Sequence, residues 1–236
     1  IRYLKPRSSF RSQYGYQNLM YIVAGKVIEK VSGKTWGQFV KERILTPLGM
    51  SRTTISVKDL KENFALPHNE SGGKLRSFQP GDVENWWGAV GVNSSVTEMA
   101  NWLRLQLGRG TFEGKQIFTR QRSAEMWQQN MFIQTNPFPA KNAPSQIFSG
   151  YGLGWNLSDY YGRKIVGHSG GLDGMLSYTA MIPQENLGVV VLTNNETAAF
   201  QILRNKILDV MLDVSPKRDW SAEALEFVNN QKKTQA

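Results

Sequence analysis

A serine flanked by glycines in the second half of the chain constrains the fold more than any other feature. The segment 167–171 reads G-H-S-G-G and matches the G-x-S-x-G pattern, in which a nucleophilic serine occupies a sharp turn between a strand and a helix. The residues that follow, 175–182, are rich in strand-forming side chains and end at Pro183, and a second such run covers 187–193. We therefore expect Ser169 to be followed by a β-hairpin rather than by a helix.

Taken at face value, the G-x-S-x-G pattern would make Ser169 the nucleophile of an α/β-hydrolase. That interpretation requires a strand–turn–helix around the serine, with an acid and then a histidine after it in the chain. The two histidines of the chain, His68 and His168, both precede Ser169. The α/β-hydrolase is therefore the less favoured hypothesis.

Composition narrows the classes of protein that need to be considered. The 236 residues, 40% hydrophobic and 20% charged, are typical of one large or two small globular domains. No apolar run approaches the roughly 20 residues that span a bilayer, so we predict no membrane span. The net charge of +9 is interspersed with acids and accompanies no nucleic-acid motif, so we predict no nucleic-acid partner. The absence of cysteine and the two distant histidines argue against a metal site, and we expect no cofactor.

The hydrophobic pattern predicts helices first, then antiparallel strands, then a closing helix. Helical spacing of apolar residues occurs in five segments: 18–32, 35–44, 98–107, 120–130 and 197–212. Strands are expected from 151 to 193, and a hairpin turn at 69–74 in a loop-rich region. A polar loop is expected at 134–146, and residues 215–236 read as a polar tail or linker. This order indicates the α+β class.

An ordered set of short motifs resembles the family of serine β-lactamases and penicillin-binding proteins, especially its AmpC-like members. Tyr16-Gln17-Asn18 is similar to the Y-x-N signature, and His168-Ser169-Gly170 is similar to the third signature, K-T-G or its H-S-G variant. Further similarity occurs in the segments 10–12, 21–33, 47–50 and 91–96. The resemblance covers nearly the whole chain. It implies a β-lactamase/transpeptidase-like fold, an antiparallel sheet flanked by helices with a helical subdomain, and a site between them.

The first signature of that family, S-x-x-K, is not found at its usual place before Y-x-N. In the family its serine and lysine share one helix face, at positions i and i+3. The S-x-x-K of this chain, Ser71 to Lys74, follows Y-x-N and contains two central glycines, which disfavour a helix. We interpret it as a turn. The nucleophile and its lysine are therefore expected upstream of Ile1, in a missing N-terminal segment, and residues 1–214 would be inactive alone.

The resemblance implies catalytic roles for Tyr16, Asn18 and His168. Tyr16 would be the general base for the serine and then the acid for the leaving group, aided by the ammonium of the family's lysine. Asn18 would orient the substrate or that lysine, although it also stands where a helix N-cap is expected. His168 would bind a substrate carboxylate or support Tyr16, with a weaker charge than the usual lysine.

The resemblance also implies substrate contacts for Ser169, Gly170 and Gly171. Ser169 would donate a hydrogen bond to the substrate, and the two glycines would allow the backbone to approach it closely. The amide of Gly171 would form half of an oxyanion hole. Alternatively, the glycines mark a β-bulge or a turn.

The function implied by the resemblance is hydrolysis through an acyl-enzyme. The substrate would be a β-lactam, a D-amino-acid peptide or an ester. The alternative from a different class is a non-catalytic fragment or binding module of the same fold. A periplasmic or secreted location is suggested by the resemblance alone.

Overall fold

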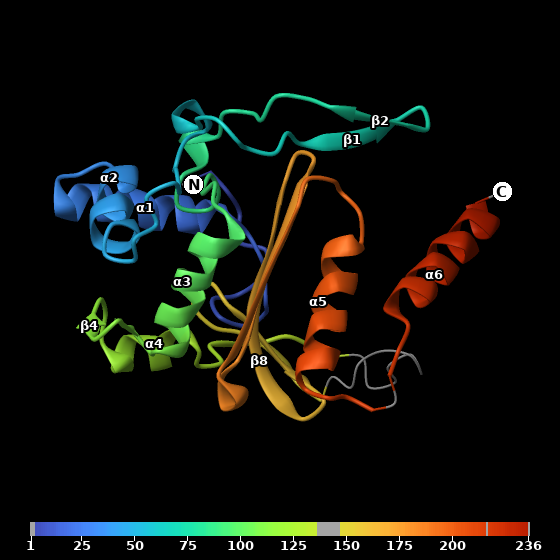
Figure 1. The fold of residues 1–236 in the computed structure, drawn as a ribbon. Helices are drawn as coiled ribbons and strands as arrows, with labels where there is room; N and C mark the ends of the chain where they lie inside the picture. The colour runs from blue at the N-terminus through green and yellow to red at the C-terminus, as the bar shows by residue number, and fades with distance from the viewer. Residues whose placement is uncertain (1–2, 136–146, 216, 236) are drawn as a thin grey trace.

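The computed structural model describes residues 3–135, 147–215 and 217–235. A six-stranded antiparallel sheet forms its centre, with strands in the order β10-β9-β8-β7-β6-β5 (Figure 1). Chain order and spatial order agree, so the sheet is a meander, as the pattern of the sequence predicts. The strands are β5 (Met131–Phe132), β6 (Ser149–Tyr151), β7 (Asn156–Tyr160), β8 (Arg163–Leu172), β9 (Met175–Ile182) and β10 (Leu187–Thr193).

Helices lie on both sides of this sheet, with α3 and α5 on opposite faces (Figure 1). The helices are α1 (Leu19–Ser32), α2 (Trp36–Val40), α3 (Val96–Leu107), α4 (Arg120–Met126), α5 (Ala199–Met211) and α6 (Trp220–Gln235). Two small hairpins complete the fold, β1 (His68–Ser71) with β2 (Lys74–Ser77) and β3 (Thr111–Phe112) with β4 (Lys115–Gln116). Together these elements confirm the α+β class and the antiparallel sheet flanked by helices.

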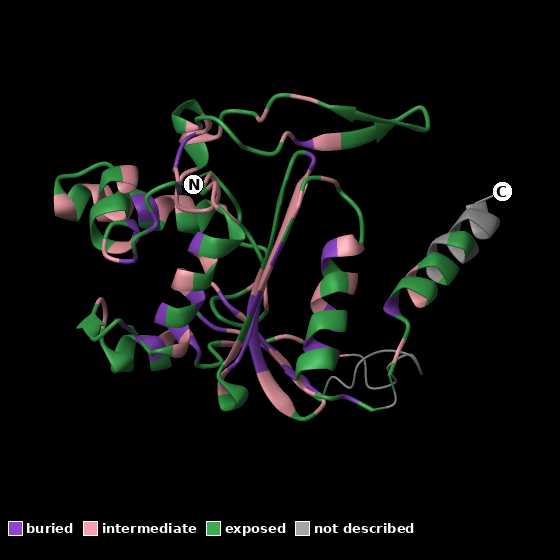
Figure 2. Ribbon diagram, viewed as in Figure 1, coloured by how far each residue is buried: buried purple, intermediate pink, exposed green. Residues whose placement is uncertain are grey.

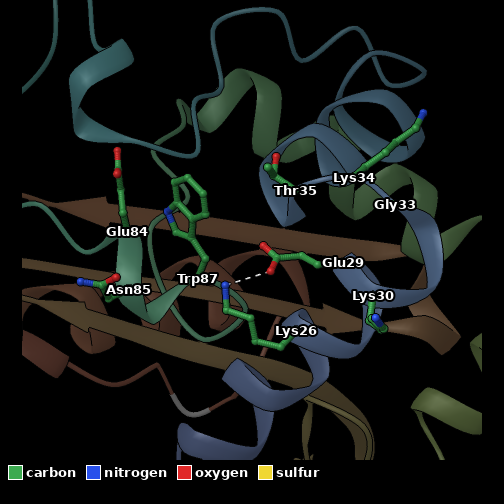
Figure 3. A pocket seen from close by; sticks show the side chains of 9 residues that line it. All are labelled: Lys26, Glu29, Lys30, Gly33, Lys34, Thr35, Glu84, Asn85 and Trp87. Atoms are coloured by element: carbon green, nitrogen blue, oxygen red, sulfur yellow. Dashed lines mark hydrogen bonds and ion pairs between the residues drawn. The ribbon is translucent and has the colours of Figure 1, made fainter.

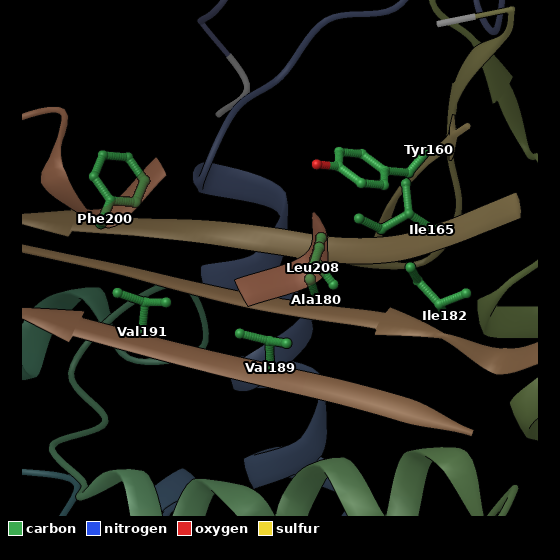
Figure 4. Close-up of a cluster of buried hydrophobic side chains, with 8 residues drawn as sticks. All are labelled: Tyr160, Ile165, Ala180, Ile182, Val189, Val191, Phe200 and Leu208. Carbon is green, nitrogen blue, oxygen red and sulfur yellow. The ribbon is translucent and has the colours of Figure 1, made fainter. Parts of the chain in front are cut away.

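Alternation along the strands gives the sheet two apolar faces. On one face Ile165, Ala180 and Val191 pack with Phe200 and Leu208 of α5 (Figure 4). The opposite face carries a second cluster, whose buried members are Leu103, Trp127, Trp155, Leu157, Val166 and Met181. Buried residues concentrate along the middle of the sheet, whereas the β1–β2 hairpin is mostly exposed (Figure 2).

The first helices form a subdomain around their own core. α2 starts with a capping box, in which Thr35 Oγ1 accepts from the Gln38 amide at 3.2 Å and Gln38 Oε1 accepts from the Thr35 amide. It continues as a π-helical turn over Lys41–Leu45. The buried residues of this core are Leu45, Leu48, Met50, Ile55, Leu105 and Phe112. At the start of α3, Ser95 is the capping residue, and its Oγ accepts from the Glu98 amide at 3.3 Å.

The C-terminal segment 215–236, predicted as a polar tail or linker, contains the helix α6. Its first residue, Trp220, is buried, and its Nε1 donates to Asp209 Oδ2 at 2.5 Å. The Tyr160 hydroxyl donates to the other oxygen of the same carboxylate. The helix is thus held to α5 at one end by a buried polar contact, which no apolar periodicity in the sequence reveals.

Two predictions about connecting segments have different outcomes. Asn69–Lys74 forms the expected hairpin turn, in which Ser71 pairs with Lys74 and both glycines have positive φ, so this S-x-x-K lies in a turn. The polar loop predicted at 134–146 falls, from residue 136 onward, outside the described residues. Among the helices of the described residues, none is long and apolar enough to cross a membrane.

Candidate active site

The second half of β8 has a free edge. β7 pairs with β8 from Arg163 to Gly167, whereas β9 pairs with it from Val166 to Leu172. Residues 168–172 therefore have β9 on one side and, within the described chain, no strand partner on the other. Backbone groups along such an edge are available to pair with an extended ligand. His168 is the first residue of this free edge.

Aromatic side chains from two separate elements lie beside His168. The Tyr16 ring, from the loop before α1, lies 5.9 Å from the His168 ring between centroids, and the Tyr151 ring, from the end of β6, lies at the same distance. Tyr16 and Tyr151 meet edge to face at 6.3 Å, and Tyr14 lies 5.6 Å from Tyr151. The fold thus brings together Tyr16 and His168, two of the predicted catalytic residues.

Hydrogen bonds hold the His168 ring at both nitrogens. Nε2 lies 3.0 Å from the Tyr151 hydroxyl, and Nδ1 lies 2.6 Å from the backbone oxygen of Ser169. Burial, followed by the contact with Tyr21, raises the pKa of Tyr151 far above its ordinary range. Burial likewise raises the pKa of Tyr14. Both phenols therefore stay protonated at neutral pH and can donate hydrogen bonds.

Sequence reasoning missed Tyr151. Its position follows from strand register, because Tyr151 pairs with Asn156, and Asn156 pairs with Gly167, next to His168. A hairpin register would have been needed to find it, and the sequence alone predicted only that strands begin near this residue.

Asn18 stands immediately before α1, but its side chain does not cap the helix. The Asn18 backbone oxygen accepts from the amides of Tyr21 and Ile22, at 3.0 and 3.1 Å. The side-chain capping is done by Gln17, whose Oε1 accepts from the Met20 amide at 2.9 Å. The half-buried side chain of Asn18 is therefore not committed to the helix end.

Ser169 and His168 lie on opposite faces of β8. Ser169 is paired with Tyr178, which packs on the α5 side of the sheet, whereas His168 is paired with Thr179. The hairpin to β9 follows, so the helix that a nucleophile elbow requires is not present after Ser169. A direct contact between Ser169 and a substrate held by His168 stays a prediction.

The two glycines of the motif belong to a continuous ladder. Gly170 pairs with Ser177 and Gly171 with Leu176, without a bulge or a turn at either position. A Cβ on Gly170 would lie 2.5 Å from Ser177 Oγ, and one on Gly171 would lie 3.3 Å from Leu176 Cδ2. The glycines thus let β8 approach the side chains of β9 closely, and the oxyanion-hole role of Gly171 stays a prediction.

A cavity of about 360 Å³ opens beside the aromatic cluster. Its lining includes Tyr14, Tyr16, Tyr21, Tyr151 and Met131, together with residues 8–11 of the preceding loop. The guanidinium of Arg11 lies 5.2 Å from the Phe10 ring in that loop. The cavity therefore has an aromatic wall and a cation at its rim. The described residues contain no group of three or more His, Asp or Glu side chains that could hold a metal ion.

A larger and shallower hollow, of about 710 Å³, lies along the C-terminal half of α1 (Figure 3). Lys26, Lys30 and Lys34 line it, and Lys26 forms an ion pair with Glu29 at 2.9 Å. None of the predicted site residues borders this hollow, so the aromatic cluster at β8 remains the candidate site.

Comparisons with known proteins agree with the fold. The family model described as Beta-lactamase matches residues 1–210. The chain is 30% identical to the unguisins hydrolase ungD' of Aspergillus campestris over 94% of this chain and 41% of that protein. It is 26% identical to the D-alanyl-D-alanine-carboxypeptidase/endopeptidase AmpH of Escherichia coli K12, over 86% and 51%. The solved octameric penicillin-binding protein homologue from Pyrococcus abyssi matches with a TM-score of 0.75 and 25% identity, over 88% of this chain and 44% of that one. The chain thus spans about half or less of the length of these relatives.

Proposed function

The chain belongs to the beta-lactamase family, and on that premise we propose that it supplies the general base and the substrate edge of a serine hydrolase that works through an acyl-enzyme. The observation that carries the proposal is the convergence of Tyr16 and Tyr151 on His168 at the free edge of β8. The nucleophilic serine and its lysine would lie in a part of the protein outside these residues. That division is consistent with the share of its relatives that the chain covers.

The roles of the residues follow from the chemistry of acyl transfer. The serine oxygen attacks the substrate carbonyl while Tyr16 accepts the serine proton, so a tetrahedral oxyanion forms. Backbone amides, including that of Gly171, stabilise this oxyanion. When the bond to the leaving group breaks, Tyr16 returns the proton to that group, and water then hydrolyses the serine ester. The Tyr16 side chain is 55% exposed, which leaves its hydroxyl open to a partner segment and to substrate.

The substrate we propose is a short peptide or amide containing a D-amino acid. The free edge of β8 favours an extended backbone as ligand, since its unpaired groups can form a ladder with a peptide. The name of the relative from Escherichia coli, which specifies a D-alanyl-D-alanine substrate, points in the same direction.

Covalent labelling tests the proposal. The intact protein is treated with a fluorophosphonate or a penicillin, digested, and the labelled peptide identified by mass spectrometry. We expect the label on a serine of an S-x-x-K segment outside residues 1–236, both in the wild type and in Ser169→Ala. A label on Ser169 would instead support the α/β-hydrolase alternative. Absence of both label and hydrolysis would support the non-catalytic binding module.

A further inference from the structure

We infer that Tyr151 is a positioning residue, which orients the imidazole of His168 so that Nδ1 carries a proton and donates, and Nε2 accepts. His168 then acts in the site as an oriented hydrogen-bonding group. The assignment of His168 to the active site rests on the proposed function, whereas the place of the proton rests on the hydrogen bonds alone.

The two contacts of the His168 ring determine the proton on Nδ1. The backbone oxygen of Ser169 can only accept, so the nitrogen 2.6 Å from it, Nδ1, has to donate. The other nitrogen, Nε2, faces the Tyr151 hydroxyl at 3.0 Å, and a protonated phenol can donate to it. This pair of partners therefore fits an imidazole in which Nδ1 donates and Nε2 accepts.

The aromatic rings around His168 are phenols: Tyr16 from the loop before α1, Tyr151 from β6, and behind them Tyr14 and Tyr21. Arg11 lines the cavity beside the same cluster. No ion pair of the described residues includes His168, and its partner on β9 is the uncharged Thr179. A hydroxyl and a backbone carbonyl are thus the groups that orient the ring.

This arrangement has a consequence for Tyr16. The lone pair of Nε2 is occupied by Tyr151, so His168 does not take the proton of Tyr16 while that hydrogen bond is in place. Instead the oriented ring packs against Tyr16, with the two planes at 34° and the centroids 5.9 Å apart. Tyr151 therefore acts on Tyr16 through the orientation of His168.

Nitrogen NMR of the histidine side chains tests the inference directly. His168→Gln assigns the signals of His168, as those that disappear from the spectrum. In the wild-type protein at pH 7.5 we expect a protonated Nδ1 and an Nε2 whose ¹⁵N shift is that of a hydrogen-bonded acceptor. In Tyr151→Phe, which removes only the hydroxyl, we expect the Nε2 shift to move to that of an unbonded acceptor and the Nδ1 proton to exchange faster.

Tyr14→Phe is the matched control, because Tyr14 packs on the Tyr151 ring at 5.6 Å and has no hydrogen bond to His168. We expect this variant to leave the His168 signals unchanged. The inference is overturned if wild-type His168 carries its proton on Nε2 or on both nitrogens, or if Tyr151→Phe and Tyr14→Phe move the signals equally. The wild-type spectrum needs no variant to fold.

The same samples separate this inference from the proposed function. If the expected spectra are found but the protein hydrolyses no amide or ester, the proton assignment stands and the proposed function fails. If hydrolysis is found, Tyr151→Phe is expected to lower kcat about tenfold with KM little changed, because Tyr16 is less well oriented. A KM effect alone would contradict the positioning role.

Discussion

Replacing Gly167 with alanine is predicted to disturb both the sheet and the active site. The added Cβ would lie 2.6 Å from the backbone oxygen of Thr179 and 3.3 Å from Ala180 Cα. These are backbone atoms of β9 and cannot rotate away, so the two strands have to separate. Restoring an ordinary contact of 3.4 Å requires the strand backbone at Gly167 to move by about 0.8 Å. Gly167 directly precedes His168, so the His168 side chain would be displaced as well.

The expected magnitudes follow from this displacement. Overpacking of a well-packed interior costs about 1–3 kcal/mol, which for a chain of this size lowers Tm by roughly 2–12 °C. A shift of about 1 Å at a catalytic group lowers kcat/KM by up to about 100-fold. We therefore expect Gly167→Ala to be less stable in urea or thermal unfolding and to be slower in amide hydrolysis.

Gly170→Ala is the matched control on the same strand. Its Cβ would lie 2.5 Å from Ser177 Oγ, which is the end of a side chain and can rotate. We expect a loss below about 1 kcal/mol, restored by adding Ser177→Ala. Equal midpoints of unfolding for Gly167→Ala and the wild type would refute the reasoning, because the clash would then have been relieved without cost.

Three further changes give separate tests. Tyr16→Phe should lower kcat by about 100- to 10,000-fold while the circular dichroism spectrum and Tm stay as in the wild type; near-normal turnover would exclude the general-base role. His168→Lys adds a full positive charge, and we expect the ratio of kcat/KM for a peptide with a free C-terminal carboxylate to that for its amide to rise about 10-fold or more; an unchanged ratio would mean that this position does not contact the substrate carboxylate. Asp209→Asn replaces an acceptor shared by Trp220 and Tyr160 with a group that presents a donor to one of them, so we expect a loss of about 1–3 kcal/mol and faster proteolysis between α5 and α6. Proteolysis at the wild-type rate would show that α6 is held by other contacts.

Much of the fold was predictable because its elements carry local signals. The apolar spacing of 18–32 and the hairpin between β9 and β10 both follow from residues close together in the sequence. The helix α6 was not predicted, because the local signals of its segment are weak. Its apolar pattern is weak, and it is held through Trp220, whose partner Asp209 is contributed by α5.

Some features of the candidate site were likewise predictable from local sequence, and others were not. The sequence by itself determined the motifs at Tyr16 and His168, the strand that carries His168, and the turn at Ser71–Lys74, since each depends on residue types at short spacing. Only the tertiary structure decided that Tyr151 bonds His168, that β7 ends before the free edge of β8, and that Ser169 faces the other side of the sheet. The physical reason is that register and pairing between strands depend on contacts between distant residues, which composition and periodicity do not encode.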